Sequence, residues 1–244
     1  KSTGGHGSGL IAGRFQVWND LIVGGYGEGL LAFTAVAPTP TVGSRIVLGL
    51  GAGSSGTLSL APAARIAATG SIIVGDAGTG LLGTGPIDPL APTATTQADL
   101  IAGHQVGSTG TISGVSLEVG SDLVIGDAGT GTGTVALGNT ATVGHDLEVG
   151  RESTGVGALE VGRQTVGMTS PELYSGSSLS VTGNALIGNQ GQGTLSMYSG
   201  TMSIGGRLGI GAGSGGSGSV TLGAATTIAD AAQLNISGNL EVGA

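Results

Sequence analysis

One short pattern recurs along the whole chain: an apolar pair or triplet that stops at a glycine. Residues 122–150 show the complete unit. There, Leu123–Gly126 is followed by a Gly/Thr-rich turn and two strand-like runs before the pattern returns at Leu147–Gly150. The two closing glycines are 24 residues apart. A repeat length in the twenties is typical of proteins built from stacked coils, in which each coil is one supersecondary unit.

This closing pattern, which we call the anchor, is found at Leu21–Gly24, Ile46–Gly49, Ile72–Gly75, Leu123–Gly126, Leu147–Gly150, Ala185–Gly188, Leu208–Gly211 and Leu240–Gly243. Successive anchor glycines are separated by steps of 25, 26, 51, 24, 38, 23 and 32 residues. The step of 51 predicts two units with one anchor that is hard to recognise. The steps of 38 and 32 each predict one unit plus a loop.

The composition excludes several other classes of protein. Glycine accounts for 53 of the 244 residues, which raises the possibilities of collagen and disorder. Collagen is excluded because glycine does not occupy every third position. Disorder is disfavoured because 39% of the residues are hydrophobic and only 9% are charged. An amyloid-like chain of low complexity is the weaker alternative.

Charge and cysteine content limit the kinds of bond, metal site and partner that we expect for this chain. The chain has no cysteine, so it forms no disulfide and no thiolate metal site. Its net charge is −8 and its seven basic residues are spread out, which argues against a nucleic-acid partner. No run of about twenty apolar residues predicts a membrane-spanning helix. No signal peptide is visible at Lys1, and because the sequence does not begin with Met we expect a processed or trimmed product.

The unit predicts an all-β fold. Each unit holds about three short strands in which apolar and polar residues alternate, as in Leu159-Glu160-Val161, and this alternation is typical of half-buried strands. Such strands are too short to bury a core alone. We therefore predict a parallel β-helix, or β-solenoid, in which equivalent strands stack about 4.8 Å apart around a slim core of Val, Ile, Leu and Ala. Nine or ten coils would give a rod roughly 45 Å long.

The domain organisation follows from where the pattern fails. Residues 1–20 fit it badly and carry Phe15 and Trp18, so we expect an N-terminal cap or a contact arm there. Residues 21–244 form a single solenoid with two expected loop excursions. One lies near 84–104, which contains three prolines, and the other near 163–177. Long loops on a regular scaffold are good candidates for binding.

A family resemblance supports this reading. The anchor is followed by Gly-Thr-Leu-Ser-Leu-like runs, such as Gly133–Leu137 and Gly193–Met197, and then by a Ser/Thr-rich strand. The pattern resembles the glycine-rich repeats of bacterial autotransporter (type V) passenger domains and of surface proteins with PEP-type sorting tails. Residues 122–150 and 185–223 carry it best. The resemblance implies a right-handed parallel β-helix exported to a bacterial surface, either as a passenger or as a free secreted subunit.

A metal site is one candidate for chemistry. The sequence Gly-Asp-Ala-Gly-Thr-Gly occurs at 75–80 and again at 126–131. If Asp76 and Asp127 stacked, their carboxylates could hold Ca²⁺, which prefers oxygen ligands. Two carboxylates are a sparse ligand set, and the calcium-binding nonapeptide repeat is not matched. We therefore favour corner aspartates that cap backbone N–H groups and expect no cofactor.

An enzyme is the second candidate. Polysaccharide-cleaving enzymes need carboxylates that converge on one groove. The acids of this chain are scattered, although four of them occur in the same context, Leu-Glu-Val, and could stack: Glu118, Glu148, Glu160 and Glu241. We favour an outward, solvated ladder for these glutamates. The sequence predicts no catalytic residue, and we expect a protein that is not an enzyme.

The function that we expect is structural. Residues 239–244 read as the opening strand of a new coil without a closing cap, and an uncovered β-edge promotes association. We expect an extracellular subunit that assembles head to tail into a surface fibre, filament or sheath. The expected contact residues are Phe15, Trp18, Tyr26, Leu240 and Val242. One alternative is an adhesin passenger whose loops bind a host surface or glycan, and another is a polysaccharide-active enzyme.

Overall fold

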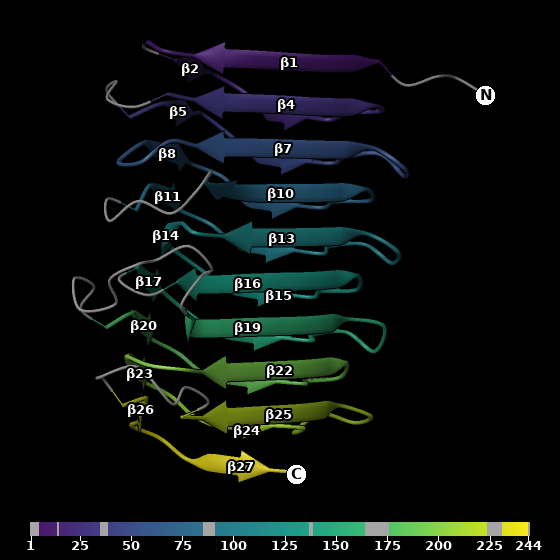
Figure 1. Ribbon diagram of the computed structural model, residues 1–244. Helices are drawn as coiled ribbons and strands as arrows, with labels where there is room; N and C mark the ends of the chain where they lie inside the picture. Colours follow the sequence, from purple (N-terminus) through teal and green to yellow (C-terminus); the bar gives the residue numbers. More distant parts are fainter. Residues whose placement is uncertain are drawn as a thin grey trace.

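The computed structural model describes residues 5–13, 15–34, 39–84, 91–136, 139–163, 176–223 and 231–243. These residues form strands and turns and contain no helix, which confirms the all-β prediction. The strands build three parallel sheets of nine strands each, as expected for a parallel β-helix (Figure 1). Every coil contributes one strand to each sheet.

The first sheet, sheet A, contains β1 (His6–Ile11), β4 (Glu28–Phe33), β7 (Ser55–Leu60), β10 (Thr79–Thr84), β13 (Thr109–Ser113), β16 (Thr130–Ala136), β19 (Val156–Arg163), β22 (Gln192–Met197) and β25 (Ser217–Leu222). Sheet B contains β2 (Gln16–Val17), β5 (Thr41–Val42), β8 (Arg65–Ala68), β11 (Thr93–Thr96), β14 (Ser116–Val119), β17 (Thr140–Val143), β20 (Ser178–Val181), β23 (Thr201–Ile204) and β26 (Gln233–Ile236). Sheet C contains β3 (Leu21–Val23), β6 (Ile46–Leu48), β9 (Ile72–Val74), β12 (Leu100–Ala102), β15 (Leu123–Ile125), β18 (Leu147–Val149), β21 (Ala185–Ile187), β24 (Leu208–Ile210) and β27 (Leu240–Val242).

The solenoid begins earlier than the expected boundary at residue 21. The strands β1 and β2 lie within residues 1–20 and belong to the first coil. The expected excursion over 84–104 is also shorter than predicted, because β11 and β12 lie inside it and pair with strands of both neighbouring coils. Prolines misled the prediction by suggesting one long loop. Residues 85–90, at the start of the first expected excursion, and residues 164–175, most of the second, lie outside the described residues.

The core is a narrow column between the sheets. Along β7 the inward residues Leu58 and Leu60 are fully buried and alternate with outward Thr57 and Ser59. Repeating this alternation in each coil gives one continuous apolar core. Because hydrophobic stabilisation scales with the apolar area removed from water, each coil is stabilised by the coils above and below it.

The anchor glycines turn the chain from one coil into the next. All of them have a positive φ, such as 74° at Gly126. A Cβ atom there would overlap the carbonyl group of Val156, in the coil after next. Gly103, with φ 71°, closes the triplet Leu100–Ala102. It is the missing anchor inside the step of 51, so the prediction of two units in that interval is confirmed.

A second column of glycines runs through all nine strands of sheet A. The strand pairing aligns Gly7, Gly29, Gly56, Gly80, Gly110, Gly131, Gly157, Gly193 and Gly218. We call this set the glycine column. In the interior coils a Cβ at this position would overlap backbone atoms of the anchor glycine just before it, or of the last sheet C residue two coils earlier, such as Val23 for Gly56. Side chains are therefore excluded by coil stacking.

The turns between anchor glycine and glycine column alternate in length. The interval is five residues for Gly24–Gly29 and Gly75–Gly80, and seven for Gly49–Gly56 and Gly103–Gly110. The alternation continues through the remaining coils. In Figure 1 the turns that lead into β7, β13, β19 and β25 extend further than their neighbours. The structural repeat is therefore two coils long, a feature that the sequence analysis missed.

Candidate functional site

The predicted contact residues lie at opposite ends of the rod (Figure 1). Trp18 and Tyr26 are 79% and 87% exposed, in the turns that follow β2 and β3 of the first coil. Leu240 and Val242 are 59% and 69% exposed, in β27 of the last coil. The structure thus does not bring these residues together within one chain. It divides them between two separate end surfaces.

Phe15 differs from the other four predicted contact residues because it is partly buried. Its ring packs edge-on against Phe33, with 5.5 Å between the ring centroids. It also lines an apolar groove of about 690 Å³ that opens beside Leu21 and Leu30 at this end of the core. Phe15 therefore covers core side chains, as an N-terminal cap would.

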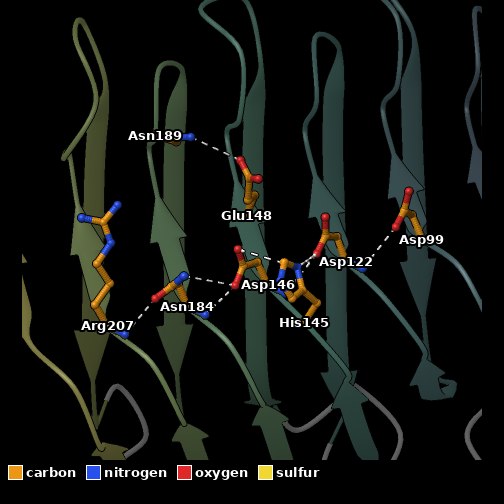
Figure 2. A network of polar contacts seen from close by, with 8 residues as sticks. All are labelled: Asp99, Asp122, His145, Asp146, Glu148, Asn184, Asn189 and Arg207. Carbon is orange, nitrogen blue, oxygen red and sulfur yellow. Dashed lines mark hydrogen bonds and ion pairs between the residues drawn. The ribbon is translucent and has the colours of Figure 1, made fainter.

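A polar column, which sequence reasoning missed, borders sheet C. It consists of the residue directly before each strand of that sheet, and its members are Asp20, Arg45, Ser71, Asp99, Asp122, Asp146, Asn184, Arg207 and Asn239. We call it the Asx column because six of its positions hold Asp or Asn. Aligning the anchors one residue further upstream would have revealed it. Figure 2 shows its middle part, in which the side chains line up across successive coils.

The Asx column joins coils by side-chain to backbone hydrogen bonds. Asp122 Oδ1 accepts the backbone N–H of Asp146 at 3.0 Å, and Asp146 Oδ1 accepts that of Asn184 at 2.6 Å. In return, the N–H of Leu123 donates to the carbonyl oxygen of Asp146 at 2.9 Å. Each such pair clamps two coils together at the start of sheet C. At the first coil, hydrogen bonds from Arg45 hold the pKa of Asp20 well below its usual range.

His145 adds an ion pair to this column. Its Nδ1 lies 2.8 Å from Asp122 Oδ1 and 3.9 Å from Asp146 Oδ2. The hydrogen bond to Asp122 raises the pKa of His145 above its ordinary value. In the described part of the chain these three residues are the one group with spacing suited to a metal ion. However, Asp122 Oδ1 is already engaged by His145 and by the N–H of Asp146.

A second charged column lies where the strands of sheet C end, whereas the Asx column lies where they begin. It is formed by the residue after each anchor glycine. In four successive coils this position holds Asp76, His104, Asp127 and Arg151. His104 Nδ1 lies 2.6 Å from Asp76 Oδ1, and its Nε2 lies 3.7 Å from Asp127 Oδ2. Arg151 Nε donates to Asp127 Oδ1 at 2.7 Å. Carboxylates and basic side chains therefore alternate along the rod.

This alternation corrects both readings of Asp76 and Asp127. The two aspartates are two coils apart with His104 between them, so they do not form the stacked carboxylate pair that was considered for Ca²⁺. The favoured reading, a cap on backbone N–H groups, also differs from the structure. The Asp76 carboxylate interacts with the side chains of His104 and Gln105, and the Asp127 carboxylate with those of His104 and Arg151.

The Leu-Glu-Val glutamates do not form a common ladder. Glu118 lies in sheet B, Glu160 in sheet A, and Glu148 and Glu241 in sheet C. Even the last two are separated by intervening coils. The same tripeptide, Leu-Glu-Val, falls in different sheets because loops of different length shift the sequence pattern relative to the coil. No groove with converging glutamates results from these four residues.

Glu148 has an unusual environment. It takes the outward middle position of its strand, where the four preceding coils carry the buried apolar residues Val47, Ile73, Ile101 and Val124. Burial raises the pKa of Glu148, and a hydrogen bond from Asn189 Nδ2 at 3.3 Å partly offsets this effect. A polar hollow of about 410 Å³ lies beside it, next to Arg151 and Glu152.

Within the described ranges, no helix is long and apolar enough to cross a membrane. Comparison with known proteins found no matching family model, no matching curated protein and no matching solved structure.

Proposed function

We propose that the chain is a structural subunit without enzymatic activity, an extracellular β-solenoid that joins end to end with further copies of itself into a surface fibre, filament or sheath. The observation that carries the proposal is the identical register of the two end coils. Gly7 of β1 and Gly218 of β25 belong to the same glycine column. A second copy can therefore continue all three sheets without a change of register.

The edges of the end strands support this joint. Gly5 and Ile11 accept hydrogen bonds from the second coil, from Glu28 and Thr34. Since backbone groups of alternate residues point to opposite edges of a strand, the N–H and C=O groups of His6, Ser8 and Leu10 point away from the second coil. By the same argument, Gly218, Val220 and Leu222 face away from β22. Among the described strands none pairs with these two edges, and such edges favour addition of a further strand.

The direction in which copies add to one another follows from the parallel pairing of every strand. A copy that keeps this pairing adds with its first coil on the last coil of its neighbour, a head-to-tail contact that does not close into a ring. The contact buries Leu10 and Ile22 on one side and Leu222, Leu240 and Val242 on the other, all of them exposed in the single chain. Removing these apolar side chains from water supplies the driving force.

We propose the absence of enzymatic activity because aspartate side chains of the chain pair with side chains of neighbouring coils. Asp76, Asp122 and Asp127 are engaged in pairs that connect successive coils. Such pairs contribute to the stacking of coils, and they engage these three carboxylates with neighbouring side chains. The extracellular, bacterial-surface location is proposed from the resemblance of the repeats to autotransporter passenger domains.

The test is a Ser8→Pro variant studied by sedimentation velocity and negative-stain electron microscopy over a range of concentrations. We expect wild type to form filaments whose length rises with concentration. Proline removes the N–H of Ser8 from the free edge, where it makes no bond to the described residues, so the single rod should still fold. We expect the concentration needed for assembly to rise about tenfold or more.

The matched control is Ser8→Ala, which keeps the N–H group and should assemble like wild type. Circular dichroism of dilute samples checks that all three proteins have the same strand content. Isolated rods of wild type at every concentration would contradict the proposal and would favour an adhesin or enzyme. Equal assembly of the proline variant would show that the end strands are not the joint.

A further inference from the structure

We propose that copies join in one fixed register, and that Asn239 sets it by accepting the backbone N–H of Asp20 from the next copy. This inference rests on the end-to-end assembly proposed above and names the contact that positions it. It arises from the Asx column, whose first and last members are Asp20 and Asn239.

Every Asp or Asn of the column that has a following coil makes the same contact. The side-chain oxygen accepts the backbone N–H of the next member of the column in five cases, at 2.6–3.2 Å: Asp20 to Arg45, Asp99 to Asp122, Asp122 to Asp146, Asp146 to Asn184, and Asn184 to Arg207. An Asx side chain at this position is therefore a reliable connector between coils. Where the column holds Arg or Ser, it lacks such a carboxylate or amide oxygen.

A backbone bond in the opposite direction accompanies each contact. The residue after the Asx side chain donates its N–H to the carbonyl oxygen of the same partner, as Leu21 does to Arg45 at 2.8 Å and Leu147 does to Asn184 at 2.8 Å. The two bonds form a closed pair between coils. This geometry requires one particular alignment, because a shift along the strand separates both donors from their acceptors.

Asn239 is the one remaining Asx member of this column. Its carbonyl oxygen accepts the N–H of Leu208, in the preceding coil, at 2.8 Å, while its side chain is exposed. At the other end, Asp20 offers a backbone N–H on the free side of the first coil. Stacking a second copy in the common register brings these two groups together, and the N–H of Leu240 meets the carbonyl oxygen of Asp20.

A second copy of the chain is the occupant that fits this end. The contact continues the coil-on-coil packing that already joins all neighbouring coils of the chain. A slip by two residues would place Gly5 or Gly9 opposite Gly218, so the glycine column by itself accepts more than one register. Such a slip would separate the Asn239 side chain and the N–H of Leu240 from their partners on Asp20. The Asx pair is therefore the contact that selects one register among those that the glycine column accepts.

Engineered cysteines test the register, and the natural absence of cysteine makes the readout clean. Ser8 and Ser219 occupy the same column of sheet A. The variant Ser8→Cys/Ser219→Cys places the two Cα atoms of neighbouring copies about 4.8 Å apart, within disulfide range. The off-register control, Ser8→Cys/Ser217→Cys, separates them by about 8 Å, which is too far. We expect oxidation to give covalent multimers only with the first pair.

Asn239 is tested by three variants. Asn239→Ala removes the acceptor, and we expect assembly to require a roughly fivefold higher concentration. Asn239→Asp keeps an acceptor of the kind used at Asp99, Asp122 and Asp146, and should assemble like wild type. Asn235→Ala, at an exposed position in β26, controls for loss of an amide elsewhere in the last coil. The melting temperature of dilute protein should not change in any of them.

The outcomes are distinct. If wild type assembles but the off-register pair cross-links equally well, the fixed register is wrong while end-to-end assembly stands. If Asn239→Ala assembles like wild type, or Asn239→Asp does not rescue assembly, the role of Asn239 is wrong. If wild type does not assemble, both the proposed function and this inference are overturned.

Discussion

The middle of the rod and its first coil use the same residue in different surroundings. Gly131, in the sixth coil, and Gly7, in the first, belong to the same glycine column. A Cβ atom at Gly131 would overlap the backbone of Gly126 and that of Ala102, which ends the sheet C strand of the fourth coil. At Gly7, a Cβ would find nothing within 4 Å. Both residues lie in strands of sheet A, but β16 pairs with β13 and β19, whereas β1 is the end strand and pairs with β4.

The comparison shows that stacking, and not the strand itself, requires the glycine. Within a strand, glycine is unfavourable because it loses more conformational freedom on folding than other residues. The interior coils accept this cost because a coil passes so close that no side chain fits. Gly7 meets no such restriction within its own chain. Its occurrence there agrees with an end surface that is crowded once a second copy is in place.

The largest expected effect separates these two glycines directly. We expect Gly131→Ala to lower the free energy of unfolding by about 3 kcal/mol or more, because the new methyl group overlaps backbone that cannot move away. Gly7→Ala should change it by less than about 0.5 kcal/mol. Urea denaturation of both variants at low concentration, where the chain is a single rod, measures the difference. Similar losses in the two variants would show that the column has another role.

Core leucines should give the next largest effect. Leu123 and Leu240 share a column of sheet C, but Leu123 is fully buried and Leu240 is 59% exposed. Leu123→Ala should cost about 2–5 kcal/mol, since it leaves a cavity in the core. Leu240→Ala should cost under about 0.5 kcal/mol in dilute protein. The comparison between middle and end fails if thermal denaturation gives the two variants equal melting temperatures.

The smallest effect concerns His145, which lies in the middle of the rod but on its surface. Because Asp122 raises the pKa of His145, the folded protein binds this proton more tightly than the unfolded chain does. The stabilisation is present below the ordinary histidine pKa of about 6.5 and is lost as pH rises through the higher pKa of the folded protein. The other charged groups nearby, Asp146 and Asp99, act in the same direction.

An NMR titration of the His145 ring should show the raised pKa, and Asp122→Asn should bring it closer to the ordinary value. Denaturation of His145→Gln at several pH values should show a weaker fall in stability as pH rises through this range. The effect should be small, because solvent screens an exposed pair. A large effect would mean that surface charge, besides burial, distinguishes the middle of the rod from its ends.

Local residue patterns were sufficient to predict much of the fold. An apolar triplet closed by glycine identifies a strand of sheet C and the turn after it, because a positive φ favours glycine whatever surrounds it. Even the unrecognised anchor at Leu100–Gly103 could be inferred from spacing alone. The exposed ends could also be anticipated, since Trp18, Tyr26, Leu240 and Val242 lie in the first and last coils.

Predictions that depended on which residues stack were less successful. Asp76 and Asp127 have identical local sequences, but they are separated by the coil that carries His104. Glu118 and Glu160 share the context Leu-Glu-Val and lie in different sheets. The Asx column went unnoticed because its successive members are 23 to 38 residues apart and are linked only by stacking.

The strands, the repeat and the positions where glycine closes a coil can be predicted from local residue patterns, because they depend on propensity, alternation and backbone conformation within a few residues. Which side chains become neighbours depends instead on how the coils stack. Neighbours in a solenoid are one coil apart, and the length of each coil depends on its turns and loops. The alternating five- and seven-residue turns and the added loops therefore set the columns, and with them the Asx contacts that connect one coil to the next.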